Sequence, residues 1–261
     1  MDAAAPQPFD IRVMNASASF LFVLAALAFA GLVVMWLARL PLFSIRGIQV
    51  DGDVSRNSVT TIRANAAPKL VGNFFTLDLA RSQQAFEAVP WVRRAIVRRV
   101  WPDRLAVRLE EHRPAAYWHR DDRDDQLVNT FGEVFDVNLG DVEDDALPTL
   151  QGPEGSAALM LDLYRRLAPV IARLDGAQLR ELKLSERGSW RVELDTGADI
   201  ELGRGGAEEV LARTEAFVDT VTQVIARYQR PLEYADLRHS TGYAVRLKGI
   251  TTVDLQAKKT K

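Results

Sequence analysis

The longest run of apolar positions lies near the start of the chain, where no charged residue occurs between Arg12 and Arg39. Residues Phe20 to Leu37 are Phe, Leu, Val, Ala, Met and Trp, with a single glycine. At a rise of 1.5 Å per residue, such a run makes about 27 Å of helix, close to the roughly 30 Å of a bilayer's hydrocarbon core. The pattern predicts a membrane-spanning helix over residues 17–38, preceded by a short tail over residues 1–16.

Two other kinds of segment can contain such an apolar run. A buried globular helix would normally have a polar stripe, and this run has none. A cleaved signal peptide would have a shorter apolar core after a basic start, whereas Asp2 and Asp10 accompany Arg12 here. We therefore expect a retained anchor. Arg12 on one flank and Arg39 with Arg46 on the other leave its orientation open under the positive-inside rule.

Beyond the anchor, short apolar patterns predict a small α+β unit over residues 43–113. Its last strand alternates, with Leu105, Val107 and Leu109 on one face and Arg104 and Arg108 on the other. The expected order is strand, helix, helix, strand, strand. We expect strands over Phe43–Val50, Trp91–Val100 and Arg104–Glu111, a helix that begins at the N-cap Ser55 and runs to Lys69, and a second helix over Leu79–Val89.

A second unit, over residues 114–248, is predicted to be a mixed β domain with two long helices. We expect a hairpin over Gln126–Val137, a loop over Pro148–Gly155 and helices over Ser156–Leu174 and Ala207–Tyr228. The remaining predicted strands are Leu179–Leu184, Trp190–Leu194, Ile200–Leu202, Leu232–Arg238 and Gly242–Lys248. Residues 249–261 are polar and basic, which predicts a flexible tail. The predicted fold class is α+β.

Composition narrows the possible chemistry. The chain is 48% hydrophobic and 26% charged, an ordinary globular balance, and its net charge of -2 does not favour nucleic acid. There is no cysteine, which excludes disulfides, thiolate nucleophiles, zinc–thiolate sites and iron–sulfur clusters.

A glycine-rich turn, Gly203 to Gly206, stands between a predicted strand and a predicted helix. A dinucleotide-binding turn would need glycine at position 208, where Glu208 stands beside Glu209, and both carboxylates would repel phosphate. A plain strand-to-helix turn is therefore favoured.

Possible metal ligands gather between residues 112 and 125. Their spacing fits no known metal-binding loop, because a calcium loop would need glycine at 126 and glutamate at 132, where Gln126 and Gly132 stand. The residues concerned are His112, His119, Asp121, Asp122, Asp124 and Asp125. We expect a solvated acidic turn. The sequence also has no recognised hydrolase motif, so we predict no enzyme activity, no metal, no cofactor and no small-molecule substrate.

Arginines cluster on the predicted hairpin of residues 91–111. A solvated sheet face is favoured, contact with lipid head groups or protein is the second interpretation, and nucleic acid is the least supported. The residues are Arg93, Arg94, Arg98, Arg99, Arg104 and Arg108, flanked by Trp91 and Trp101.

Several short motifs follow one another along the chain. They are Leu40-Pro41-Leu42, Val89-Pro90-Trp91-Val92, Trp101-Pro102-Asp103-Arg104-Leu105, Glu110 to Pro114 with Trp118, Leu147-Pro148, Gly152-Pro153-Glu154-Gly155-Ser156, Ser189-Trp190, Leu202-Gly203-Arg204-Gly205 and Tyr234-Ala235-Asp236-Leu237-Arg238. In this order and spacing they resemble the motifs of the bacterial FtsQ/DivIB family of cell division proteins. The similarity covers nearly the whole chain from Phe20 to about Leu247.

The resemblance implies a single-pass protein of the cell inner membrane, with a cytoplasmic N-terminus and a periplasmic body concentrated at the division septum. That body would comprise a POTRA domain over residues 43–113 and a β domain over residues 114–248. The implied role is a division scaffold that recruits the small coiled-coil proteins FtsB and FtsL and links them to other division and septal wall synthesis proteins.

The resemblance also implies a mode of binding, in which a partner strand adds to the last strand of the β domain. The partner-facing candidates carried over by position are Arg238, His239, Thr241, Gly242, Tyr243 and Val245. Arg238 is expected to pair with an acidic group of the partner. His239 stands where the family usually has tyrosine, and Arg246-Leu247 replaces Gly-Trp, so Tyr243 is our candidate for the aromatic anchor.

Two other functions stay open from sequence. A POTRA-bearing component of protein translocation or secretion would call for tandem POTRA units or a barrel-length series of strands. An anchored periplasmic hydrolase would call for a pocket with perturbed carboxylates.

Overall fold

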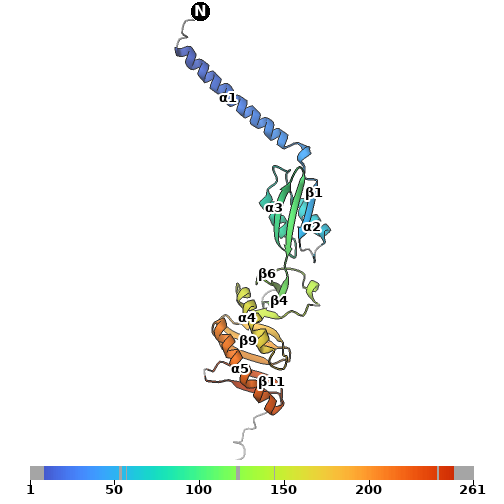
Figure 1. The fold of residues 1–261 in the computed structure, drawn as a ribbon, viewed down its shortest axis with the longest axis vertical. Helices are drawn as coiled ribbons and strands as arrows, with labels where there is room; N and C mark the ends of the chain where they lie inside the picture. Colours follow the sequence, from blue (N-terminus) through green and yellow to red (C-terminus); the bar gives the residue numbers. More distant parts are fainter. Residues whose placement is uncertain are drawn as a thin grey trace, which may run out of the picture. The chain divides into compact units, whose positions relative to one another are not determined.

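A computed structural model describes residues 9–249 apart from 53, 54, 57, 122, 123, 144 and 240. Most of the predicted tails (residues 1–8 and 250–261) and Asp122 lie outside the described residues. The chain divides between Glu111 and His112 into two compact units (Figure 1). Each unit is described by itself below.

The N-terminal helix α1 spans Phe9–Ala38, so it begins before the predicted start of the membrane segment. Within residues 14–38, an 18-residue window reaches a mean hydropathy of 2.7, and no residue of that window is buried inside the protein. A helix that is apolar on all sides and covered by no protein is suited to lipid. Pro41 begins a short 3-10 helix, Pro41–Phe43, that ends the anchor.

The rest of the first unit has the predicted order of strand, helix, helix, strand, strand. Its elements are β1 (Gly47–Gly52), α2 (Val59–Ala66), a 3-10 turn (Ala67–Lys69), α3 (Leu79–Glu87), β2 (Val92–Val100) and β3 (Arg104–Glu111). β3 lies in the middle of the sheet, parallel to β1 and antiparallel to β2. Ile62 and Phe86 from the helices pack with Val107 and Leu109 of β3 to form the core.

Two boundaries in this unit differ from the prediction. β1 begins at Gly47 rather than Phe43, because Pro41 directs the preceding residues into a 3-10 turn. Ser58, and not Ser55, caps α2 by accepting a hydrogen bond from the Thr61 N–H at 3.0 Å. The Ser55 N–H and hydroxyl instead donate to the buried Glu111 carboxylate at 2.7 and 3.1 Å.

The second unit is built on one nine-stranded mixed sheet, in the order β12-β11-β10-β9-β8-β7-β4-β5-β6. Its elements are β4 (Pro114–His119), β5 (Gln126–Asn129), β6 (Val134–Phe135), a 3-10 helix (Leu139–Val142), β7 (Thr149–Gln151), α4 (Ala157–Ile171), β8 (Leu179–Leu184), β9 (Ser189–Leu194), β10 (Asp199–Arg204), α5 (Ala207–Tyr228), β11 (Leu232–Asp236) and β12 (Ala244–Leu247). With its helices, this architecture confirms the α+β class.

Helices α4 and α5 contact each other and the sheet (Figure 1). Their apolar faces bury Met160, Leu167, Phe217 and Val221 against the strands, with side chains that are at most 1% exposed. Burying each such side chain contributes about 1.5–3 kcal/mol. α5 has its predicted bounds, whereas α4 ends at Ile171, two residues beyond Pro169.

Several short strands differ from the prediction. β7 lies inside the predicted loop of residues 148–155, where it pairs in parallel with β4 and β8. Three residues are too few to display an alternating pattern, so their sheet partners decide the conformation. The last two strands are shorter than predicted, because β11 ends at Asp236 and β12 begins at Ala244.

Candidate functional site

The last strand, β12, forms one edge of the nine-stranded sheet. It pairs antiparallel with β11, for example Ala235 with Val245 and Asp236 with Ala244. Within the part of the chain that the structure describes, no strand lies on its other side. A strand in this position presents unpaired main-chain groups that another chain can use.

The direction of the β12 main chain can be read from one hydrogen bond. The Lys248 N–H donates to the Pro231 carbonyl at 2.9 Å, so the main-chain groups of Lys248 face β11. Main-chain groups point to opposite sides at successive strand positions. Val245 and Leu247 therefore direct their N–H and C=O groups toward the open edge.

The side chains of β12 and the residue before it hold the strand on the domain. The Tyr243 ring meets Phe217 of α5 edge to face, with centroids 4.9 Å apart. Leu247 is buried in the domain core and Val245 is half-buried against it. Tyr243, our candidate aromatic anchor, thus packs within its own domain, and its contact with a partner stays a prediction.

The turn between β11 and β12 carries the exposed candidates His239, Thr241 and Gly242. A Cβ added at Gly242 would have no atom within 4 Å. Its backbone is not left-handed, so nothing in the fold requires glycine here. All six predicted partner-facing residues therefore lie in one stretch, from the end of β11 into β12.

Arg238 is held by a neighbour that sequence reasoning did not single out. Its Nε and Nη2 donate to the two carboxylate oxygens of Asp236 at 2.8 and 2.6 Å, and its backbone N–H donates to the same carboxylate at 3.0 Å. These bonds lower the pKa of Asp236 to about 2, chiefly through the Arg238 side chain, and raise the pKa of Arg238. Residues two apart in a strand lie on the same face, so the Asp-x-Arg spacing at the strand end was the signal in the sequence from which this ion pair could have been predicted.

The predicted glycine-rich turn lies directly against Arg238. Gly203 has a φ of +83°, and a Cβ there would come within 3.1 Å of both the Arg238 Cγ and the Arg213 Nη1. Arg213 in turn donates to the carbonyls of Leu202 and Arg204. The turn is thus a strand-to-helix connection, as predicted, and its first glycine also makes room for two arginine side chains.

These arginines surround a surface hollow of about 500 Å³ beside the turn that precedes β12. It is lined by Arg187, Arg204, Arg213 and Arg238 together with two serines, Ser185 and Ser189. No carboxylate lines it among the described residues. Such a hollow favours an anionic group.

The possible metal ligands do not form a cage. Among the described residues, no group of three His, Asp or Glu side chains could hold a metal ion. His119 instead bonds Asp125 at 2.8 Å and lies 3.5 Å from Asp121. Asp122 lies outside the described residues, and the predicted absence of a metal stays a prediction.

Carboxylates elsewhere in the fold serve ion pairs. Glu110 pairs with Arg93 at 2.8 Å, while its neighbour Glu111 is buried on the opposite face of β3. The pKa of Glu208 is lowered because Arg166 donates to it at 2.6 Å. A carboxylate with a lowered pKa is suited to holding a charge pair rather than to delivering a proton.

Comparison with known proteins covers both units. Residues 43–112 match the family model described as POTRA domain, FtsQ-type, and residues 116–238 match cell division protein FtsQ/DivIB, C-terminal. The chain is 41% identical over 242 residues to cell division protein FtsQ of Burkholderia pseudomallei, covering 92% of this chain and 94% of the relative. It is 40% identical over 256 residues to the FtsQ of Bordetella pertussis, covering 91% and 92%.

A third relative, the cell division protein FtsQ of Thiomonas arsenitoxydans, is 38% identical over 253 residues, covering 96% of this chain and 93% of its own. The relatives and the apolar helix α1 together indicate a single-pass membrane protein. Both domains match FtsQ-type family models, and the 41% identity extends over 92% of the chain. The chain therefore belongs to the FtsQ/DivIB family of cell division proteins.

Proposed function

We propose that this chain is a division scaffold that recruits FtsB and FtsL through a partner strand added to β12. The observation that carries the proposal is the open edge at Val245 and Leu247, whose main-chain groups face away from β11. Each added backbone hydrogen bond contributes about 0.5–1.5 kcal/mol, so a short strand alone binds weakly. Side-chain contacts must supply the rest of the affinity.

The four-arginine hollow, lined by Arg187, Arg204, Arg213 and Arg238, supports an acidic group on the partner. The bonds to Asp236 use Nε and Nη2 of Arg238, and no described residue bonds to its Nη1 group. An acidic side chain can therefore share this guanidinium without displacing Asp236. Asp236 holds the guanidinium in place before the partner arrives.

The same proposal includes a place in the cell. The N-terminus would be cytoplasmic and the body periplasmic, at the inner membrane of the division septum, where the body also links to other division and septal wall synthesis proteins. Family membership supports this arrangement. The FtsQ-type description of the matched POTRA domain favours the division role over translocation or secretion.

The binding test distinguishes the contribution of the Val245 main-chain N–H to affinity from that of the Val245 side chain. Val245→Pro removes the outward N–H, and proline is tolerated on an edge strand where that N–H faces solvent. Val245→Ala trims the side chain but keeps the N–H. Affinity of the full chain, in detergent, is measured for the periplasmic part of the FtsB–FtsL pair, with thermal unfolding as the control for folding.

We expect Val245→Pro to weaken binding about tenfold or more relative to Val245→Ala, while both variants unfold cooperatively. Such a loss corresponds to about 1.4 kcal/mol, within the range of one or two backbone hydrogen bonds. Equal affinities for the two folded variants would contradict strand addition at this edge.

A further inference from the structure

The anchor helix is joined to its POTRA domain by more than the connecting chain. The Asn73 side-chain amide donates to the carbonyl of Ala38, the last residue of α1, at 2.5 Å. The next residue, Phe74, donates its N–H to the Phe43 carbonyl at 2.9 Å, and the Phe43 and Phe75 rings meet edge to face at 4.9 Å. The loop before α3 is therefore held at the end of α1.

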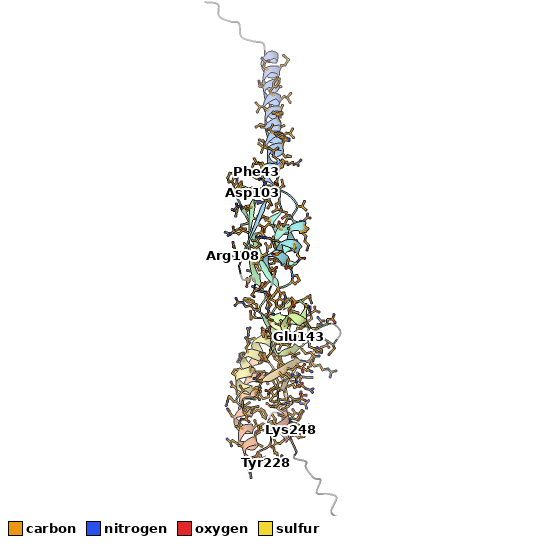
Figure 2. The ribbon with its side chains drawn as sticks, turned by 90° about the vertical axis from the view of Figure 1, so that its right-hand side faces the viewer. Phe43, Asp103, Arg108, Glu143, Tyr228 and Lys248 are labelled. Atoms are coloured by element: carbon orange, nitrogen blue, oxygen red, sulfur yellow. The ribbon has the colours of Figure 1, made fainter. Side chains whose placement is uncertain are left out.

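The turn between β2 and β3 lies at the same end of the domain. The Arg46 N–H donates to the Asp103 carbonyl at 2.8 Å, and Arg99 donates to the Leu77 carbonyl at 2.6 Å. Figure 2 places Phe43 and Asp103 together at this end. We call residues 38–46, 71–77 and 99–104 the membrane-side end of the POTRA domain.

This end exposes large apolar side chains from all three segments. Leu42 is 65% exposed, Val71 75%, Phe75 51% and Trp101 73%. Single exposed apolar residues are ordinary, but several from separate segments gathered at one end mark an interaction surface. Tryptophan and phenylalanine side chains are suited to the boundary between lipid head groups and acyl chains.

A basic hollow of about 420 Å³ lies at the same end. It is lined by Arg46, Arg63 and Arg104 with a single carboxylate, Asp103. Arg39 adds another exposed cation at the end of α1. Among the described residues, no side-chain hydrogen bond or ion pair involves the guanidinium of Arg39, Arg46 or Arg104.

We propose that the membrane-side end docks on the bilayer that α1 crosses. The exposed apolar side chains enter the interface and the arginine hollow receives the phosphate of an anionic lipid. Lipid is the occupant because the surface is continuous with the membrane helix, through the Asn73–Ala38 bond as well as the chain. The proposal requires that α1 crosses a membrane, but it does not depend on partner binding at β12. It holds whichever side of the membrane the body occupies.

The chain has no cysteine, so a single introduced cysteine can carry a fluorescent label at one position. Phe75→Cys and Trp101→Cys place the label on the membrane-side end. Ile96→Cys is the matched control, because Ile96 is similarly exposed at 49% but lies in the middle of β2. The full chain is reconstituted in vesicles containing nitroxide-labelled lipid, with and without phosphatidylglycerol, and quenching of the label is measured.

We expect strong quenching at positions 75 and 101, weak quenching at 96, and more quenching at 75 and 101 when phosphatidylglycerol is present. In the Trp101→Cys background, Arg104→Ala should lower the ratio of docked to undocked domain about fivefold, since one basic residue near an anionic surface has about this effect. Arg108→Ala should not change this ratio, because Arg108 lies four residues further along β3, which at about 3.3 Å per residue is about 13 Å from Arg104. Figure 2 shows Arg108 away from Phe43 and Asp103.

Labels at 75 and 101 that are quenched no more than the label at 96 would overturn the proposal and leave the surface to a protein partner. Equal quenching with and without phosphatidylglycerol, or equal effects of Arg104→Ala and Arg108→Ala, would overturn the assignment of the arginine hollow to anionic lipid. Both results are independent of whether β12 binds FtsB and FtsL.

Discussion

Arg238 illustrates how one residue can serve both fold and recognition. Its side chain is 55% exposed, yet two of its nitrogen atoms are bonded to the nearly buried Asp236. A guanidinium held in this way loses less conformational freedom when an acidic partner arrives. The resemblance predicts Arg238 as a partner contact, whereas the bonds by which Asp236 holds it are shown by the structure.

Asp236 predicts a dependence of stability on pH. Its pKa is lowered in the folded chain to about 2, so its stabilising effect is complete above the unfolded value near 4 and is lost as pH falls from 4 toward 2. Because Arg238 is half exposed and solvent screens the pair, we expect at most about 1 kcal/mol at neutral pH. Urea unfolding of the wild type should show this loss between pH 4 and 2.

The matched variant Asp236→Asn should be less stable at pH 7 and should show a smaller loss of stability over the same acid range. If the variant has the same free energy of unfolding as the wild type at every pH, the role of this ion pair in the fold is contradicted.

Two glycines near the site make an internally controlled pair. Gly203 has a left-handed backbone and close neighbours, so Gly203→Ala should lower the free energy of unfolding by about 1–2 kcal/mol. Gly242→Ala meets no atom within 4 Å and should change it by less than about 0.5 kcal/mol. Chemical denaturation measures both, and a Gly203→Ala variant as stable as Gly242→Ala would show that the close approach to Arg238 and Arg213 is not needed.

At the scale of elements, long periodic segments could be predicted and short ones could not. α5 has its predicted bounds because its apolar positions recur over 22 residues, and β3 alternates over 8. β7, with three residues, forms only because β4 and β8 pair with it. A residue distant in sequence likewise decides the cap of α2. Ser55 donates to the buried Glu111 carboxylate, and the Ser58 hydroxyl accepts the hydrogen bond from the Thr61 N–H instead.

The candidate site was only partly predictable for the same reason. The resemblance to the family implied that the last strand has an exposed edge, and β12 does lie at the edge of the sheet. The four-arginine hollow draws on residues from 187 to 238, which only the folded sheet and α5 bring together. Tyr243 precedes β12 instead of lying in it, and its contact with Phe217 could not be predicted from the sequence.

At the scale of the whole molecule, the chain has two units with separate cores, and the first unit begins with the apolar helix. Charge counting left the orientation of the helix open, because Arg39 and Arg46 follow it. The proposed docking of the membrane-side end gives those arginines a role in lipid contact. Arg39 and Arg46 next to the helix are then compatible with a body on the outer side of the membrane, although positive charge is usually found on the inner side.

The proposed orientation can be tested with one exposed residue. Thr241→Cys places a unique thiol in the exposed turn before β12. In cells whose outer membrane has been made permeable, a maleimide that cannot cross the inner membrane should label it. Labelling only after the inner membrane is lysed would place the body in the cytoplasm and contradict the proposal.

Amide hydrogen exchange along β12 tests the central claim most directly, because strand addition changes specific backbone N–H groups. In the free full-length chain, the Val245 and Leu247 amides should exchange quickly, while the inward-facing Lys248 amide should be protected by Pro231. Saturating the chain with the periplasmic part of the FtsB–FtsL pair should slow exchange at Val245 and Leu247 by about tenfold or more. Exchange at these two amides that stays unchanged in the saturated complex would contradict the account.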